Sequence, residues 1–105
     1  MKKRELAFSD VAIADILDQA DWYAKQSGQR LAQRWEKAVT SAVSLVLRRP
    51  AAGALCTFHA PTLRGVRRAT ITGFPKHLIF YLFDDEEVFV LRVVHGARDL
   101  ESLFS

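Results

Sequence analysis

Two stretches with helical hydrophobic periodicity follow each other almost without interruption, and this constrains the fold more than any other feature of the sequence. In the first stretch the apolar stripe consists of Ile13, Ile16, Leu17, Ala20 and Tyr23. In the second it consists of Leu31, Trp35, Ala38, Val39, Ala42, Leu45 and Val46. Gly28 separates the stripes, and Pro50 ends the second by disfavouring helical backbone at Arg49. We therefore predict two helices joined as an antiparallel hairpin.

Three carboxylates of the first helical stretch lie largely off its apolar stripe: Asp15, Asp18 and Asp21. Ser9 and Asp10 precede the stripe and are suited to cap a helix N-terminus. Before them, residues 5–8 are short and end in apolar residues, which indicates a strand that leads into the hairpin.

Three further segments are rich in β-branched and aromatic residues: 66–72, 78–83 and 88–94. The short breaks between them favour sequential antiparallel pairing, and the unbroken apolar run 78–83 should form the most buried strand. Residues 51–65 have no period and are predicted to be a long loop. The fold class is therefore α+β in the order βααβββ, with the hairpin on one face of an antiparallel sheet. Leu100, Leu103 and Phe104 indicate a short C-terminal helix.

Length and composition favour a single domain spanning residues 1–105, because half of the 105 residues are hydrophobic and suffice for one core. No apolar run approaches the roughly 20 residues of a membrane-spanning helix. The charged start lacks a secretory signal pattern, so we expect a soluble cytoplasmic protein with no membrane partner. The formal charge of +3 is a mild excess. The central arginines could form a basic face or an ordinary solvated surface.

The sequence does not predict a metal site, a cofactor site or a nucleophilic cysteine. His59, His77 and His95 are scattered and lack paired ligand spacing, so no metal is predicted. Cys56 stands alone without an activating neighbour, and it cannot form an internal disulfide. A glycine-rich phosphate loop is absent from the sequence, and no cofactor is expected.

Several short motifs, taken with the element order, resemble the RelE/ParE superfamily of toxins and its ParE-like branch. They are Gly65-Val66-Arg67-Arg68, Gly73-Phe74-Pro75, Leu78-Ile79-Phe80-Tyr81 and Leu91-Arg92-Val93-Val94-His95-Gly96-Ala97-Arg98-Asp99-Leu100. The resemblance covers nearly the whole chain and implies a RelE-like toxin fold. It also implies the toxin of a type II toxin–antitoxin system that forms a hetero-oligomer with a cognate antitoxin. RelE-like members cut messenger RNA in the ribosome, whereas characterised ParE-like members inhibit DNA gyrase without known catalytic residues.

An RNA-cleaving site needs a base, cations for the phosphate and an acid. If the chain were a nuclease, its candidates would be His95, Arg67 and Arg92, but the tail after Gly96 contains no tyrosine to complete the set. We therefore predict a non-enzymatic toxin that inhibits its target by stoichiometric binding, with DNA gyrase as the target that the resemblance implies. A ribosome-dependent endoribonuclease of RelE type and an inactive antitoxin-binding relative are the alternatives.

Six residues are candidates for contacting the target or partner: Arg67, Arg68, Arg92, His95, Arg98 and Trp22. Each also has a structural interpretation. Trp22, like Tyr23 and Trp35, is expected to seal the hairpin against the sheet, although its displacement from the main stripe suits an exposed anchor as well. Arg98 is suited to pair with Asp99 or to cap the terminal helix.

Overall fold

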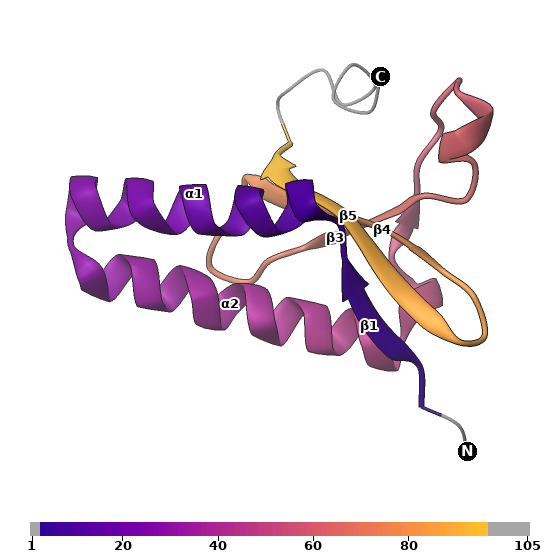
Figure 1. The fold of residues 1–105 in the computed structure, drawn as a ribbon, viewed down its shortest axis with the longest axis horizontal. Coiled ribbons are helices and arrows are strands. Elements are labelled where there is room, and N and C mark those ends of the chain that lie inside the picture. Colours follow the sequence, from indigo (N-terminus) through magenta and orange to yellow (C-terminus); the bar gives the residue numbers. More distant parts are fainter. Residues whose placement is uncertain (1–2, 97–105) are drawn as a thin grey trace.

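The computed structural model describes residues 3–96 and contains two long helices beside a five-stranded sheet (Figure 1). The elements are β1 (Glu5–Phe8), α1 (Asp10–Ser27), α2 (Gln29–Arg48), η1 (Pro50–Ala52), β2 (Ala54–Leu55), η2 (Pro61–Leu63), β3 (Arg67–Thr70), β4 (His77–Phe83) and β5 (Glu87–His95). The predicted helical hairpin and the three later strands are confirmed. The predicted C-terminal helix lies outside the described residues.

The sheet has the strand order β1-β5-β4-β3-β2, which places β4 at its centre, as the apolar run predicts. β3, β4 and β5 form the predicted antiparallel meander. The sheet as a whole is mixed, however, and the expectation of an antiparallel sheet is wrong at one edge, where β1 pairs with β5 in parallel. The helical hairpin carries the chain away from β1 before the meander begins, so β1 can lie beside the last strand and run in its direction.

The segment predicted as a loop, residues 51–65, contains two 3-10 turns and the two-residue strand β2. β2 pairs only with Arg67 and Arg68 of β3, and it forms the second edge of the sheet. So short a strand has no periodicity that a sequence pattern could reveal.

The ends of the helices follow local rules. The Ser9 hydroxyl accepts a 2.9 Å hydrogen bond from the Ala12 amide and donates a 2.7 Å bond to the Leu91 carbonyl. The cap therefore also fastens the start of α1 to β5. Gly28 has a φ of 90°, a backbone conformation that glycine adopts more easily than other residues. It is the C-cap of α1 and the N-cap of α2.

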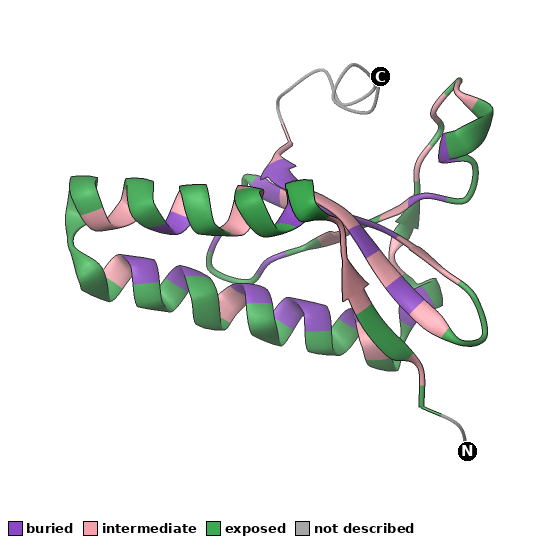
Figure 2. Ribbon diagram, in the orientation of Figure 1, coloured by how far each residue is buried: buried purple, intermediate pink, exposed green. Residues whose placement is uncertain are grey.

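Successive side chains of β4 point to opposite faces of the sheet, and each face has its own apolar cluster. Ile79 and Tyr81 pack with Trp35 and the helices, whereas Phe80 packs with Leu63 and Val66 from the connecting segment before β3. Figure 2 shows the buried residues concentrated along the side of α2 nearest the sheet and in the strands.

The apolar stripes are wider than the surfaces that the helices bury. Ile13 and Leu17 on α1 are 44% and 55% exposed, and Leu45 on α2 is 54% exposed, although all three were expected to face the core. The small residues Ala12 and Ala20 form the buried side of α1 instead. α1 packs mainly against α2 and β5, so one flank of its stripe remains open to solvent.

Candidate functional site

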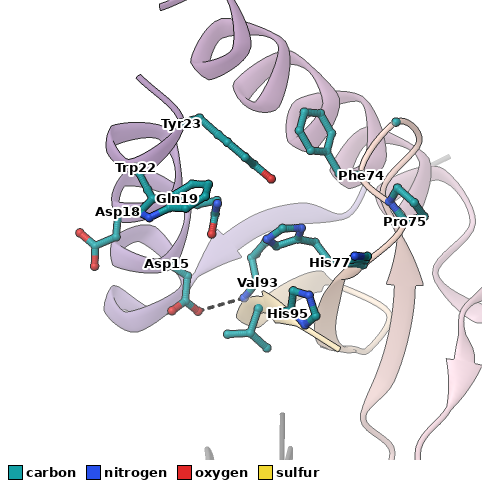
Figure 3. Close-up of a pocket in the computed structure, with 13 residues that line it drawn as sticks. Asp15, Asp18, Gln19, Trp22, Tyr23, Phe74, Pro75, His77, Val93 and His95 are labelled. Atoms are coloured by element: carbon teal, nitrogen blue, oxygen red, sulfur yellow. Dashed lines mark hydrogen bonds between the residues drawn. The ribbon is translucent and has the colours of Figure 1, made fainter. Parts of the chain in front are cut away.

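A hollow of about 860 Å³ lies between α1 and the end of the sheet where β4 begins and β5 ends. Its lining residues are Asp15, Asp18, Gln19, Trp22, Tyr23, Gly73, Phe74, Pro75, Lys76, His77, Val93, Val94 and His95. In Figure 3 the labelled α1 side chains form one wall, and the Phe74–Pro75 turn with the two histidines forms the other. We refer to this hollow as the aromatic pocket.

Two histidines meet in the aromatic pocket. His77 on β4 lies directly opposite His95 on β5, and their ring centroids are 5.6 Å apart in a T-shaped arrangement. His77 is buried, and its ring also contacts the Trp35 ring at a centroid distance of 4.7 Å. Burial and, to a lesser degree, the neighbouring His95 lower the pKa of His77 below 6.5. His77 therefore resists carrying a positive charge in the folded protein.

The sequence analysis treated these histidines as scattered and missed their pairing. A signal was present, because antiparallel pairing of two strands across a short turn places the start of one beside the end of the other. Within residues 3–96 the structure forms no group of three or more histidine, cysteine or carboxylate side chains that could hold a metal. Cys56 is partly buried in the connecting segment, where burial raises the pKa of its thiol.

Arg92 forms an ion pair beside the aromatic pocket. Its Nε and one terminal nitrogen donate to the two carboxylate oxygens of Asp15, at 2.8 and 3.0 Å. The Val93 amide donates to the same carboxylate at 3.0 Å, and the bond to Asp15 is the main reason that the pKa of Arg92 is raised. Asp15, expected off the apolar stripe, thus fastens α1 to β5, and Arg92 is committed to an internal contact.

The aromatic residues of the hairpin occupy two different environments. Trp35 is fully buried, and its indole N–H donates to the Ile16 carbonyl at 3.1 Å, so its expected place in the core is confirmed. The same expectation is wrong for Trp22, which is 55% exposed and touches Tyr23 edge-on with ring centroids 5.6 Å apart. The displacement of Trp22 from the stripe was the signal for its exposure.

Arg67 and Arg68 lie toward the other end of the sheet. Arg67 faces the connection after α2, where it donates to the Gly53 and Ala51 carbonyls at 2.7 and 3.2 Å. It pairs with Tyr81 in the sheet, whereas His95 pairs with His77, roughly 13 Å away along β4 at the usual rise of a strand. The structure therefore does not bring Arg67 to His95. Arg98 lies outside the described residues.

Arg68 is exposed and lines a second hollow of about 550 Å³ between α2 and β3, which we call the basic groove. Small apolar residues and two arginines define it: Ala42, Leu45, Val46, Arg49, Ala54, Arg68 and Ala69, together with Ala52, Gly53, Thr70, Leu78 and Tyr81. The Tyr81 hydroxyl donates to the Pro50 carbonyl at 2.7 Å and fixes the connection along the groove. A side chain at Gly53 would collide with this hydroxyl.

Comparisons with known proteins agree with this architecture. One solved structure, titled "Chromosomal ParDE TA system from P. aeruginosa", superposes with a TM-score of 0.72 at 20% identity, covering 89% of this chain and 96% of that one. At this identity the likeness concerns the fold. No curated protein matches the sequence. Among the described residues, no helix has the length and apolar character needed to cross a membrane.

The sequence itself matches a family model over most of its length. The model is described as "ParE toxin of type II toxin-antitoxin system, parDE", and the match covers residues 6–100. This range includes the helical hairpin, every strand from Leu6 onward, and the residues that line both hollows. The chain therefore belongs to the ParE toxin family and is the toxin of a type II toxin–antitoxin system.

Proposed function

We propose that this toxin inhibits DNA gyrase by stoichiometric binding and that a cognate antitoxin neutralises it by forming a hetero-oligomer that masks its binding surface. The observation that carries the proposal is the ParE family match over residues 6–100. Gyrase acts on chromosomal DNA, so the proposed site of action is the cytoplasm.

The arrangement of the candidate catalytic residues supports a binding mechanism. Proton transfer and phosphate stabilisation require a base and cations that converge on one reacting group. Arg92 is held by Asp15, and Arg67 is held by loop carbonyls at the other end of the sheet from His95. Both arginines are thus engaged in structural contacts instead of converging with His95 on one reacting group, which favours an inhibitor over a nuclease.

Two of the candidate contact residues are exposed, Trp22 beside the aromatic pocket and Arg68 on β3. An exposed tryptophan and an exposed arginine are the residue types that most often anchor protein interfaces. We propose that these two make direct partner contacts, while Arg67, Arg92 and His95 act by maintaining the surface. Arg98 remains a candidate contact from the sequence.

A titration of gyrase supercoiling with purified toxin tests the proposal. Inhibition should be complete near one toxin per gyrase binding site and should not increase with incubation time, because binding consumes toxin without turnover. In parallel, ribosomes programmed with a defined messenger RNA should leave that RNA uncut.

His95→Ala separates the binding mechanism from the nuclease alternative. A general acid–base group contributes about 10²–10⁴-fold to rate, so a nuclease that depends on His95 would lose nearly all cleavage in this variant. Arg30→Ala, on the exposed first turn of α2, is the matched control. Fragmentation of RNA by substoichiometric wild-type toxin, abolished in His95→Ala and retained in Arg30→Ala, would replace the proposed function with the RelE-type activity.

A further inference from the structure

We propose that the solvent-facing side of α2 is a binding surface for the phosphate backbone of duplex DNA, through which the toxin contacts the DNA that gyrase holds. The inference rests on the proposed function in one respect, because gyrase is taken as the enzyme that presents the DNA. The surface and its nucleic-acid ligand go beyond that function, and DNA binding can be measured without gyrase.

Cationic and hydroxyl side chains follow one side of α2 at three- and four-residue spacing. They are Arg30, Arg34, Lys37, Ser41, Ser44 and Arg48, and we call them the basic stripe. With about 3.6 residues per turn, these positions lie on the side of the helix opposite the buried Trp35, Val39 and Val46. All the side chains of the stripe are exposed, and Figure 2 shows exposed residues along the side of α2 that faces away from the sheet.

The positive charge of the basic stripe is not compensated by nearby acids. The one carboxylate of α2, Glu36, lies about a third of a turn away around the helix, and no residue of the stripe forms an ion pair within residues 3–96. α1 has the opposite sign, because it carries four aspartates against one lysine, namely Asp10, Asp15, Asp18 and Asp21 against Lys25. The two helices of the hairpin therefore differ in charge, and an anionic ligand is attracted to α2.

The length and chemistry of the basic stripe fit a duplex better than they fit other anions. At the usual helical rise of about 1.5 Å per residue, Arg30 and Arg48 lie about 27 Å apart along the axis, and duplex DNA presents phosphates at regular intervals over such a distance. The serine hydroxyls between them are groups that proteins use to bind phosphates. The stripe contains no aromatic ring on which unpaired bases could stack and no apolar side chain that could anchor a peptide. Because phosphate contacts carry no sequence information, binding should be independent of base sequence.

Fluorescence anisotropy with the purified wild-type toxin tests the surface directly. The labelled probes are two short DNA duplexes of unrelated sequence and equal length, a single strand of one of them, an RNA duplex of that length and a polyglutamate peptide. The two DNA duplexes should bind equally well, more tightly than the single strand and the peptide, and no more weakly than the RNA duplex. The logarithm of the association constant should fall with the logarithm of the salt concentration with a slope of about −3 to −4, as expected if each cation of the stripe neutralises one phosphate.

The double variant Arg34→Glu/Lys37→Glu should weaken duplex binding by at least about tenfold and make the salt slope shallower by about two, because two phosphate contacts are replaced by repulsion. Lys25→Glu/Lys76→Glu makes the same change in net charge at exposed positions outside the basic stripe. It should change the affinity by less than about twofold, because salt screens charges that are distant from the bound phosphates. Glutamate is as favourable in a helix as the residues that it replaces in α2, so the fold should be retained, and circular dichroism checks this.

The same two variants connect the basic stripe with gyrase. If the stripe contacts DNA that gyrase holds, Arg34→Glu/Lys37→Glu should inhibit supercoiling only at a several-fold higher concentration than the wild-type toxin. Lys25→Glu/Lys76→Glu should inhibit as the wild-type toxin does, and both variants should bind DNA-free gyrase with wild-type affinity. An inhibitory concentration that is unchanged in Arg34→Glu/Lys37→Glu would overturn the contact with gyrase-held DNA.

The DNA surface itself is overturned if the single strand, the RNA duplex or polyglutamate is preferred, or if Lys25→Glu/Lys76→Glu weakens duplex binding as much as Arg34→Glu/Lys37→Glu does. The anisotropy readouts do not involve gyrase. A wild-type toxin that binds duplex DNA through the basic stripe yet leaves gyrase active would refute the proposed target and retain the DNA surface. A toxin that inhibits gyrase but binds no duplex would retain the target and refute the surface.

Discussion

The aromatic pocket lies between α1 and the end of β5, and the basic groove lies between α2 and β3. Their side chains are held in different ways. The pocket residues Tyr23, Phe74 and His77 pack their rings against the buried Trp35 behind them, and the nearby Arg92 is paired with Asp15. In the groove several residues are small, and Arg49 has no ion pair within the described residues. The pocket side chains are therefore fixed by contacts with one another, whereas Leu45 and Arg49 at the groove remain exposed.

Replacing Trp35, the buried ring against which the pocket's aromatic residues pack, should have the largest effect on stability. Trp35→Ala removes a fully buried ring and its hydrogen bond to Ile16, and should lower the free energy of unfolding by about 3–5 kcal/mol. The matched change in the groove, Leu45→Ala, alters a half-exposed side chain and should cost less than about 1 kcal/mol. Urea unfolding followed by circular dichroism measures both. Equal losses would remove the distinction between the two regions.

Two arginines that both lie opposite Phe80 in the sheet register provide a second comparison. Arg92→Ala leaves the mostly buried Asp15 carboxylate without its guanidinium and should cost about 2–3 kcal/mol. Arg68→Ala removes an exposed side chain and should change stability by less than about 0.5 kcal/mol. Thermal unfolding of the two variants checks the difference. A destabilised Arg68→Ala protein would show that Arg68 has an internal structural role.

The burial of His77 should make the stability of the folded protein depend on pH. Because the pKa of His77 is lower in the folded protein than the unfolded value of 6.5, the unfolded chain binds the proton more readily. Stability is therefore retained above that pH and falls as the pH decreases through it. The melting temperature should be lower at about pH 5.5 than at about pH 7.5, and His77→Phe should reduce the difference. A wild-type curve that is flat across this interval would contradict the lowered pKa.

Trp22 should give the smallest effect on stability, because its side chain is more than half exposed. Trp22→Phe is expected to change the free energy of unfolding by less than about 0.5 kcal/mol. It should nevertheless shift the fluorescence emission to shorter wavelength, since the remaining tryptophan, Trp35, is fully buried. If the emission of the wild-type protein is already that of buried indole, Trp22 is covered in solution and its proposed contact role loses support.

Much of the secondary structure could be predicted because its causes are local. The stripes of the two helices, the cap at Ser9, the break at Gly28 and the end at Pro50 each depend on residues within a few positions of one another. The strands β4 and β5 were equally clear from their apolar and β-branched runs. The strand β2 was missed because two residues carry no periodic signal.

The candidate site was less predictable, because the role of each side chain depends on the residues that contact it in the folded protein. Arg67 and Arg68 are neighbours in sequence, but the alternation of a strand turns Arg67 toward the loop carbonyls and Arg68 to the opposite face of the sheet, where it is exposed. From the sequence, Asp15 was expected to be a surface carboxylate. The structure shows that it binds Arg92, which is far along the chain. His77 and His95 likewise become a pair only through the register of β4 and β5.

By itself, then, the sequence determined the helical hairpin, the meander and the ParE family resemblance, since periodicity, capping and motif spacing are properties of the chain. Only the tertiary structure decided that β1 joins β5 in parallel and that Trp22 and Leu45 stay exposed. It also decided that Arg92 is bound, while Arg49 and Arg68 have no ion pair within residues 3–96. The physical reason is that burial and charge pairing are relations between distant segments. Their free energies depend on distances that packing alone sets.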